Sequence, residues 1–200
     1  MFYRCLRVLC GYALCALLCV SRIDASQPNV VIIFADDQGY GDLSCFGSQT
    51  INTPNIDRLA EQGRKFTNFM VASPVCTPSR AALMTGCYPK RVGLHQHVLF
   101  PTSKKGLNPT EHTIADHLKT LGYATACFGK WHLGSLEGEV PNDRGFDEFH
   151  GFLGGAHPYW ITGSRSKIMH NREHDPLAKG HATELFTQWA EGFIRENAGK

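Results

Sequence analysis

Apolar residues gather in three short runs that predict β-strands. The run at residues 30–35 is continuous and rich in β-branched side chains, which is typical of a parallel strand buried on both faces. Residues 66–71 and 123–128 form the second and third predicted strands. The segment 94–107 has no strong period, and the segment 137–181 is rich in glycine, proline and histidine. Both segments are therefore predicted to be mostly loop.

Helical patterns alternate with these strands. The first predicted helix begins after the start signal Thr53-Pro54 and ends at the stop signal Gly63. The last predicted helix is indicated by apolar residues that recur on one helical face. The four predicted helices cover residues 55–62, 78–85, 108–121 and 183–197. The alternation predicts an α/β fold, with a mostly parallel sheet and helices on both faces. No repeat or low-complexity linker divides residues 26–200, so we expect them to form part of one domain.

The first 25 residues predict a secretory signal peptide. Arg4 and Arg7 form a positive start, residues 8–20 are apolar, and Ala25 offers a small residue for cleavage. The apolar stretch is too short for a comfortable transmembrane span, with an uncleaved anchor as the alternative. We expect a secreted or periplasmic protein with no stable membrane insertion after the signal is cleaved.

Removal of this signal leaves a chain with balanced charge. Without Arg4, Arg7, Arg22 and Asp24, the 20 basic and 18 acidic side chains become 17 of each. No long basic run stands out, which argues against nucleic acid or an anionic surface as the main partner. The four cysteines beyond residue 25 show neither a disulfide framework nor the Cys-x-x-Cys spacing of a zinc site.

Three groups of reactive residues lie just beyond the predicted strands. Asp36-Asp37 follow the first strand, Cys76 follows the second, and Lys130-Trp131-His132 follow the third. In open α/β sheets, ligands bind beyond the carboxyl ends of the strands. The spacing alone therefore predicts that these residues share one site.

Asp36 and Asp37 are adjacent carboxylates at a strand end. Without a cation they would repel each other, and the pKa of one would rise. A hard divalent cation with oxygen ligands removes this conflict. The alternative is a surface turn, since Asp-Asp-Gln-Gly is good turn composition.

Cys76 comes two residues before Pro78 and four residues before Arg80. Proline suits the first turn of a helix, so Cys76 is predicted at a helix N-terminus, where free N–H groups favour anions. Arg80 adds a fixed positive charge that can bind an oxyanion or a metal-ligand carboxylate. The alternative is a core cysteine before an ordinary capped helix.

Lys130 and His132 flank Trp131 just after the third predicted strand. An ammonium group can stabilise a developing oxyanion, and a histidine can accept a proton. The alternative is a loop with a packed Trp131 and solvated neighbours. His95 and His97 have the spacing of two metal ligands, but no third ligand accompanies them, which favours a solvated pair.

The segment that begins Cys76-Thr77-Pro78-Ser79-Arg80 and continues to residue 91 resembles the signature of the sulfatase family. Residues 29–41, 129–134 and 144–155 are similar to further sulfatase motifs. The resemblance runs from about residue 29 to the end of the chain. It implies the N-terminal part of a catalytic domain with the alkaline-phosphatase-like sulfatase fold, and we expect the chain to be truncated relative to that family.

The resemblance implies an arylsulfatase-like sulfuric ester hydrolase. In that family a formylglycine-generating enzyme oxidises the signature cysteine, here Cys76, to formylglycine (3-oxoalanine). Its hydrate suits the reaction, because one hydroxyl attacks sulfur and the other expels sulfate as the aldehyde re-forms. The implied substrate is a sulfate ester of an aryl or carbohydrate alcohol.

The resemblance also assigns roles to the other motif residues. Asp36 and Asp37, together with the converted residue at Cys76, are implied to bind a calcium ion. The implied oxyanion-binding and proton-transferring residues are Arg80, Lys130 and His132.

The sequence departs from the family pattern at several positions. Ala156 stands where some members place a serine that contacts sulfate, with His157 as a possible replacement, and Cys87 stands where the family often has arginine. The Asp-Asn pair that completes the family's metal site is absent. We therefore expect these 200 residues alone to be weakly stable or inactive.

Two other functions are compatible with parts of the sequence. A phosphatase or phosphodiesterase of the same broad fold would use a hydroxyl nucleophile, for which Thr77 is the candidate, but Cys76, Pro78 and Arg80 argue against it. The second alternative is a catalytically inactive sulfatase remnant that binds sulfated glycans or a partner. The chemical state of Cys76 distinguishes this remnant from an enzyme.

Overall fold

The computed structural model describes residues 27–199, and the predicted signal at residues 1–25 lies outside them. The described residues fall into two units, 27–35 and 36–199. In chain order the elements are the 3-10 turns η1 (Tyr40–Asp42) and η2 (Ser44–Phe46), the helices α2 (Pro54–Gln62), α3 (Cys76–Thr85) and α4 (Ile114–Thr120), then β1 (Ala126–Lys130), η3 (Pro141–Asp143), β2 (Glu148–Phe152), β3 (Trp160–Thr162), η4 (Gly163–Arg165), β4 (Met169–His170), β5 (Glu173–His174), β6 (Lys179–His181) and α5 (Ala182–Asn197). Within residues 27–199, no helix has the length and apolar character needed to cross a membrane.

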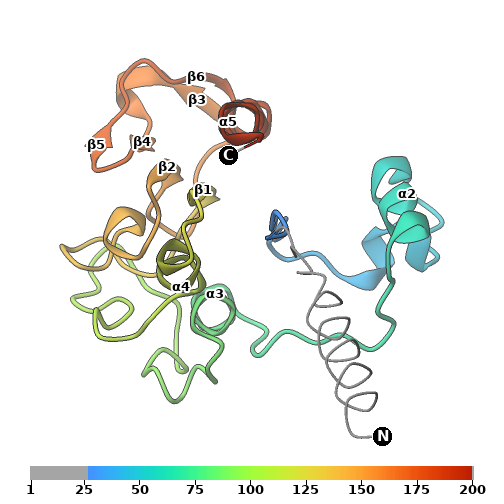
Figure 1. Cartoon of the computed structure of the whole chain (residues 1–200), viewed down its shortest axis with the longest axis horizontal. Helices are drawn as coiled ribbons and strands as arrows, with labels where there is room; N and C mark the ends of the chain where they lie inside the picture. Colours follow the sequence, from blue (N-terminus) through green and yellow to red (C-terminus); the bar gives the residue numbers. More distant parts are fainter. Residues whose placement is uncertain (1–26, 200) are drawn as a thin grey trace, which may run out of the picture. The chain divides into compact units, whose positions relative to one another are not determined.

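A four-stranded sheet carries its strands in the order β1-β2-β4-β5 (Figure 1). β1 and β2 are parallel, with Ala126 opposite Glu148 and Lys130 opposite Phe152. β4 pairs antiparallel with both β2 and β5, and β3 and β6 form a separate antiparallel pair. The sheet is therefore mixed, with one parallel pairing.

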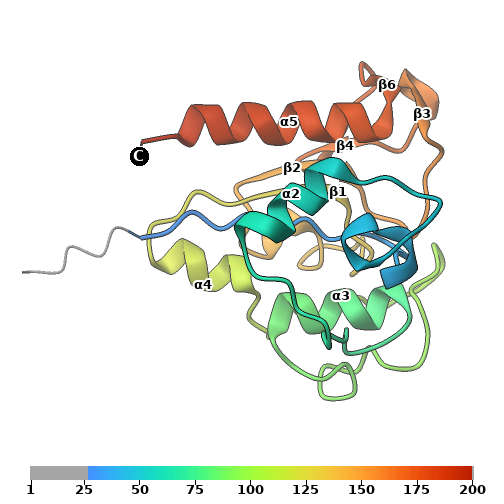
Figure 2. The same ribbon diagram turned by 90° about the vertical axis from the view of Figure 1, so that its right-hand side faces the viewer.

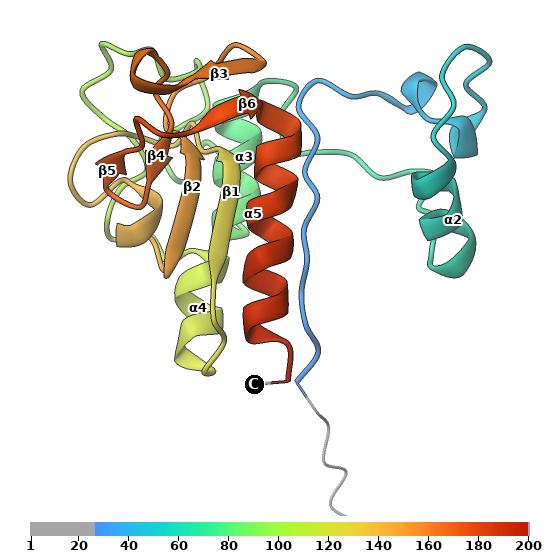
Figure 3. The same ribbon diagram turned by 90° about the horizontal axis from the view of Figure 1, so that it is seen from above.

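Helices cover both faces of this sheet, as the α/β prediction requires. α5 lies on one side of β1 and β2, whereas α3 and α4 lie on the other (Figures 1 and 2). α5 packs beside β1 along its length (Figure 3). The two clusters of buried residues follow these layers. One joins α3 to the β1–β2 pair through Ala81, Leu133 and Phe149, and the other lies under α5 around Ile161 and Ile168.

Local signals correctly predicted three of the helices. α2 begins at Pro54 and ends before Gly63, and α5 covers the predicted amphipathic segment. α3 begins at Cys76 and ends before Gly86, whose φ of 65° closes the helix in the left-handed conformation. Cys76 thus lies in the first turn of a helix, as predicted.

The predicted start of α4 at residue 108 is wrong by several residues. Asn108 instead opens a turn, in which its backbone carbonyl accepts a hydrogen bond from the Glu111 N–H. The helix begins after Thr113, whose hydroxyl accepts from the Asp116 N–H at 3.1 Å while Asp116 accepts from the Thr113 N–H at 2.8 Å. This reciprocal capping box satisfies two otherwise unpaired donors and therefore fixes the start of the helix.

The predicted strands at residues 30–35 and 66–71 are both wrong. Neither segment pairs with another strand among residues 27–199. Their apolar side chains are largely exposed, with Ile33 at 86% and Met70 at 79%. A strand requires a neighbouring strand to satisfy its backbone groups, and an apolar run alone does not supply one.

The prediction of a mostly irregular stretch at 137–181 missed β2, the parallel partner of β1. Phe149 and Gly151 point to the buried side, and their neighbours in the strand are half-buried. Gly151 faces Gly129 so closely that a Cβ at Gly151 would lie 1.9 Å from the Gly129 carbonyl oxygen. The glycine in this strand therefore permits a close approach of two backbones.

The half-buried side chain of His150 on β2 packs among aromatic rings. Its ring lies 4.0 Å from that of His170 on β4 and 4.7 Å from that of Trp189 on α5. Burial and the neighbouring His170 lower the pKa of His150 to about 4, and they outweigh the opposing charge of Asp175. Glu148 lies 3.4 Å from His150 Nε2 and also favours the charged ring, but the half-buried, stacked setting dominates.

The fold is expected to lose stability as the pH falls from about 6.5 to about 4. In this window the unfolded histidine takes up a proton while folded His150 stays neutral, which lowers the free energy of unfolding by up to about 3 kcal/mol. Urea titrations across this range measure the effect. H150F is expected to flatten the pH dependence, whereas H97Q, at an exposed position, is expected to leave it unchanged. If the free energy of unfolding varied equally with pH in the wild type and in H150F, His150 would not be the source of the pH dependence.

Candidate functional site

The carboxylate of Asp36 is held by two cationic side chains. Arg80 Nη2 lies 3.1 Å from its Oδ1, and Lys130 Nζ lies 2.6 Å from its Oδ2. The side chains of Arg80 and Lys130 are only 11% and 10% exposed, whereas that of Asp36 is 42% exposed. The three charges sum to one positive charge, so this group attracts an anion that approaches from the exposed side.

α3 places Arg80 one helical turn after Cys76, on the same face of the helix. Arg80 Nη1 donates to the backbone carbonyl of Lys130 at 2.7 Å, which ties the helix to the last residue of β1. Cys76 is half-buried at the first turn, where unpaired backbone N–H groups favour negative charge. The end of β1 and the helix that begins at Cys76 are thus brought together.

Thr77 connects this helix to the loop after β1. Its buried hydroxyl donates to the His132 carbonyl at 3.0 Å and accepts from the Leu99 N–H at 3.1 Å. Because both bonds are structural, this hydroxyl is not presented to a substrate. The alternative in which Thr77 acts as a phosphatase nucleophile therefore has no support from the geometry.

His132 lies in a strained and buried setting. Its backbone has a φ of 59°, which is uncommon for a residue with a side chain, and the residue is 3% exposed. Its Nε2 lies 2.8 Å from the Leu99 carbonyl oxygen. A carbonyl only accepts, so Nε2 carries the proton and Nδ1 has a free lone pair in the neutral ring.

The Nδ1 atom of His132 is buried and has no hydrogen-bond partner among the described residues. Burial lowers the pKa of His132, and the charges of Lys130 and Arg80 lower it further, against the hydrogen bond that the ring donates to the Leu99 carbonyl and the charge of Asp36. The ring therefore stays neutral at ordinary pH. Gly155 packs directly on this ring, because a Cβ there would lie 2.6 Å from His132 Cε1.

The pKa of Asp36 responds to the same group of charges. Burial is the largest single influence and raises the pKa, but the hydrogen bonds and charges of Lys130 and Arg80 together hold it below its ordinary value. Asp36 is therefore ionised at neutral pH, and its negative charge is available to a cation as well as to these two side chains.

Asp37 follows with a φ of 55°, which marks a left-handed turn directly after Asp36. The two carboxylates supply hard oxygen donors of the kind that calcium prefers. No three histidine, cysteine or acidic side chains within residues 27–199 gather closely enough to hold a metal. The described acids therefore match calcium in chemistry but supply fewer donors than its usual six to eight.

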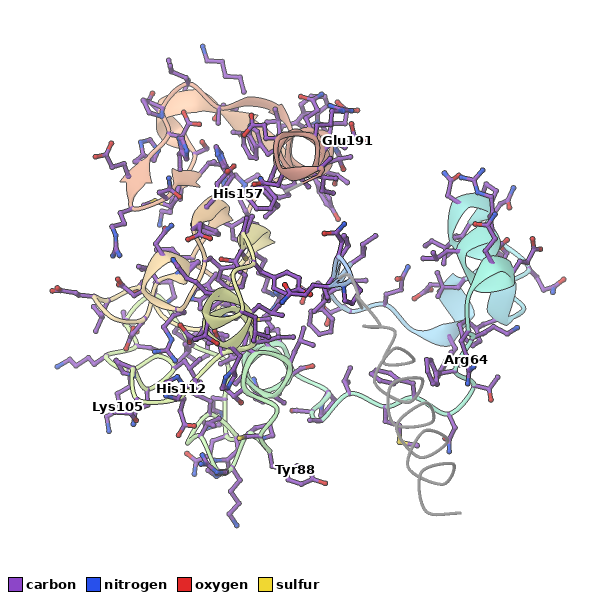
Figure 4. All side chains as sticks on the ribbon, viewed as in Figure 1. Arg64, Tyr88, Lys105, His112, His157 and Glu191 are labelled. Carbon is purple, nitrogen blue, oxygen red and sulfur yellow. The ribbon has the colours of Figure 1, made fainter. Side chains whose placement is uncertain are left out.

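The other residues singled out in the sequence lie in varied surroundings. His157 lies on the loop after β2 (Figure 4), and its ring contacts that of Phe152 in a tilted arrangement with centroids 5.4 Å apart. Phe152 is the strand partner of Lys130. Ala156 is exposed beside it. His95 and His97 are exposed in an irregular segment and belong to no metal cluster among residues 27–199. Cys87 packs against the core rather than against the charged group.

Sequence reasoning missed two contributors to the site: the Leu99 carbonyl and the structural hydroxyl of Thr77. Leu99 acts through its backbone, which no side-chain pattern reports. Gly155 lies within the motif segment 144–155, and as a glycine it allows a close approach of backbone and ring.

The family model described as Sulfatase matches residues 28–200. Arylsulfatase A of Homo sapiens is 51% identical over 144 residues, a match that covers 71% of this chain and 27% of that protein. Steryl-sulfatase of Mus musculus is 50% identical over 135 residues, which cover 62% of this chain and 22% of that protein. The chain thus spans about a quarter of the length of these curated relatives.

Solved structures resemble the fold as well. The crystal structure of Ps i-CgsB has a TM-score of 0.80 and 36% sequence identity, and the match covers 86% of this chain and 42% of that chain. The structure of BT4656 in complex with its substrate D-glucosamine-2-N,6-O-disulfate has a TM-score of 0.68 and 30% identity, and it covers 85% of this chain and 31% of that chain.

Proposed function

This chain belongs to the sulfatase family, and from that premise we propose that the protein hydrolyses a sulfate ester to an alcohol and sulfate. The observation that carries the proposal is the convergence of Arg80 and Lys130 on Asp36, beside the helix that begins at Cys76. A partly exposed, net positive group at a helix N-terminus is suited to bind the anionic head of a sulfate ester.

Cys76 is the proposed site of the nucleophile. Conversion to formylglycine at this position would supply an aldehyde hydrate, whose hydroxyl attacks sulfur while its second hydroxyl allows later release of sulfate. The position in the first turn of α3 places this carbon where backbone N–H groups favour an anionic ligand. The proposal requires a formylglycine-generating enzyme as a partner during synthesis.

Arg80 and Lys130 are the proposed ligands of the sulfate oxygens. Both are nearly buried and are held in place, Arg80 by the Lys130 carbonyl and Lys130 by Asp36. Because they are already positioned, they stabilise charge that develops on the oxygens without further reorganisation.

His132 is the proposed base. Its Nε2 proton is directed to the Leu99 carbonyl, so the Nδ1 lone pair can accept a proton from a hydroxyl of the nucleophile. The lowered pKa keeps the ring neutral and therefore ready to accept a proton at the pH of most extracellular fluids. A protonated ring beside Lys130 and Arg80 would in turn favour donation of that proton.

Asp36 and Asp37 are the proposed carboxylate ligands of calcium, which would supply a positive charge next to the sulfate. The described residues form only part of a calcium coordination sphere. No step of the proposed reaction therefore depends on the ion.

Calcium is expected to raise the melting temperature of the protein, because an ion that binds the folded state stabilises it by mass action. The increase is expected to shrink in D37N, which removes one charged ligand. E184Q, a matched change at an exposed position on α5, is expected to respond like the wild type. Thermal unfolding with and without calcium measures this, and an equal response of D37N and E184Q would exclude Asp37 as a ligand.

The proposed substrate is an aryl or carbohydrate sulfate. Arylsulfatases are among the relatives, and BT4656 was solved with a disulfated glucosamine. We also propose export to the periplasm or the extracellular space. No observation on residues 27–199 favours the inactive remnant over the enzyme.

The test of this function is hydrolysis of 4-nitrophenyl sulfate by protein that is co-expressed with a formylglycine-generating enzyme, and turnover by these 200 residues would overturn the expectation from the sequence that they are inactive alone. We expect release of 4-nitrophenol and inorganic sulfate in equal amounts. Intact conversion at position 76 without any turnover, over a range of aryl and sugar sulfates, would count against the proposal.

A further inference from the structure

A small cavity lies beside β4 and the residues that follow β2. Its volume is about 270 Å³, and it is lined by Leu153, Gly154, Lys167, Met169 and His174. None of these residues belongs to the charged group around Asp36. The volume lies near the lower end of small-molecule pockets, which run from about 300 to 1,000 Å³, so it suits one ring rather than an oligosaccharide.

The cavity wall is joined directly to the proposed base. The Leu153 carbonyl accepts a hydrogen bond from the His132 N–H at 3.1 Å, and Gly155 packs on the His132 ring. Gly154, which lines the cavity, lies between these two contacts. Gly154 in the cavity wall is therefore flanked in the sequence by two residues that contact His132, namely Leu153 and Gly155.

The lining is apolar with a cationic edge. Leu153 and Met169 supply the apolar surface, and the exposed Lys167 supplies a positive charge. His174 directs its Nε2 to the Ser166 carbonyl, so this nitrogen is a donor and the ring is held in place. Asp175, the adjacent acid, already accepts the N–H groups of Leu177 and Ala178, so its carboxylate is engaged in the turn.

We propose that this cavity binds the organic ring of the substrate and that Lys167 selects rings that carry a second anionic group. The proposal rests on the proposed function, in which the sulfate ester is held by Arg80 and Lys130. The apolar walls suit the face of a ring, and a carboxylate or second sulfate at its edge would pair with the ammonium group.

The experiment compares the binding of phenyl sulfate and 4-carboxyphenyl sulfate to the full chain by NMR titration. The wild type is expected to bind the carboxylated ring about three-fold more tightly, the range expected for a solvent-exposed ion pair. K167A is expected to lose this preference and K167R to keep it. K105A is the control, since Lys105 is exposed and is not one of the residues that line the cavity. The methyl resonance of Met169 is expected to shift when either ligand is added.

An unchanged preference in K167A, or a Met169 methyl resonance that does not respond to ligand, would overturn the proposal. Mass analysis of the Cys76 peptide and the turnover assay report the proposed function separately. A converted, active protein without the preference refutes only the ring site. A preference that Lys167 controls in a protein with an unmodified Cys76 supports the ring site and counts against the enzyme.

Discussion

Replacement of Cys76 by alanine is expected to abolish sulfate-ester hydrolysis, by a factor on the order of 10³ or more, because the variant lacks the atom from which the nucleophile is made. Serine at this position is expected to be similarly inactive, since a single hydroxyl has no second hydroxyl to expel sulfate. The fold should be unaffected, because Cys76 is half-buried at the first turn of α3 and neither forms a disulfide nor belongs to the core clusters. Initial rates with 4-nitrophenyl sulfate measure the effect.

Cys87 provides the matched control. It is also a partly buried free cysteine, but it packs against the core beyond the end of α3. C87A is expected to keep its turnover and to show the same modification at position 76. In the wild type, the peptide that carries residue 76 should have the mass of one sulfur-for-oxygen exchange with loss of two hydrogens. An unmodified thiol in an active protein would falsify the formylglycine assignment.

Helices were predictable because their signals are local. Pro54 and Gly63 lie next to the helix that they bound, and the apolar face of α5 can be read from a single segment. The error at α4 has the same origin. Asn108-Pro109 and Thr113-Asp116 are both plausible starts, and only the second forms the reciprocal hydrogen bonds of a cap.

Strands were less predictable because they depend on a distant partner. The run at 30–35 has ideal strand composition but no strand neighbour among residues 27–199, whereas β2 has a glycine and two half-buried polar residues and still pairs with β1. The pairing of Gly129 with Gly151 joins residues 22 positions apart, and their close approach is visible only once both backbones are in place.

The candidate site depends both on local sequence signals, which can be predicted, and on contacts between distant residues, which cannot. The rule that reactive residues gather at strand ends correctly placed Lys130 at the end of β1, but Cys76 follows no strand. The helix that begins at Cys76 reaches the site because the hydroxyl of Thr77 binds the carbonyl of His132. That contact joins a side chain to a backbone atom 55 residues away, which the sequence pattern could not indicate.

Replacement of Arg80 by methionine is expected to damage both stability and catalysis. Arg80 joins Asp36 to the backbone carbonyl of Lys130, the last residue of β1, through bonds of 3.1 and 2.7 Å, and its side chain is 11% exposed. Loss of these charge-assisted bonds is expected to lower the free energy of unfolding by about 2 kcal/mol. Loss of a preorganised cation is expected to lower turnover by roughly 10²- to 10³-fold.

Arg91 provides the control for this prediction. A change at Arg91 shows the effect of removing an exposed arginine, whereas a change at Arg80 removes a nearly buried arginine that makes two hydrogen bonds. Arg91 also pairs with a carboxylate, Glu111 at 3.0 Å, but its side chain is 63% exposed, so R91M is expected to cost less than about 1 kcal/mol and to keep its turnover. R80K retains the charge but cannot reach both the Lys130 carbonyl and Asp36, so it is expected to fold better than R80M while its turnover stays low. Urea titrations and initial rates on the same preparations measure both effects. If R80M and R91M lost stability and turnover equally, Arg80 would be an ordinary surface cation, and the convergence of charges on Asp36 would have no role in binding sulfate.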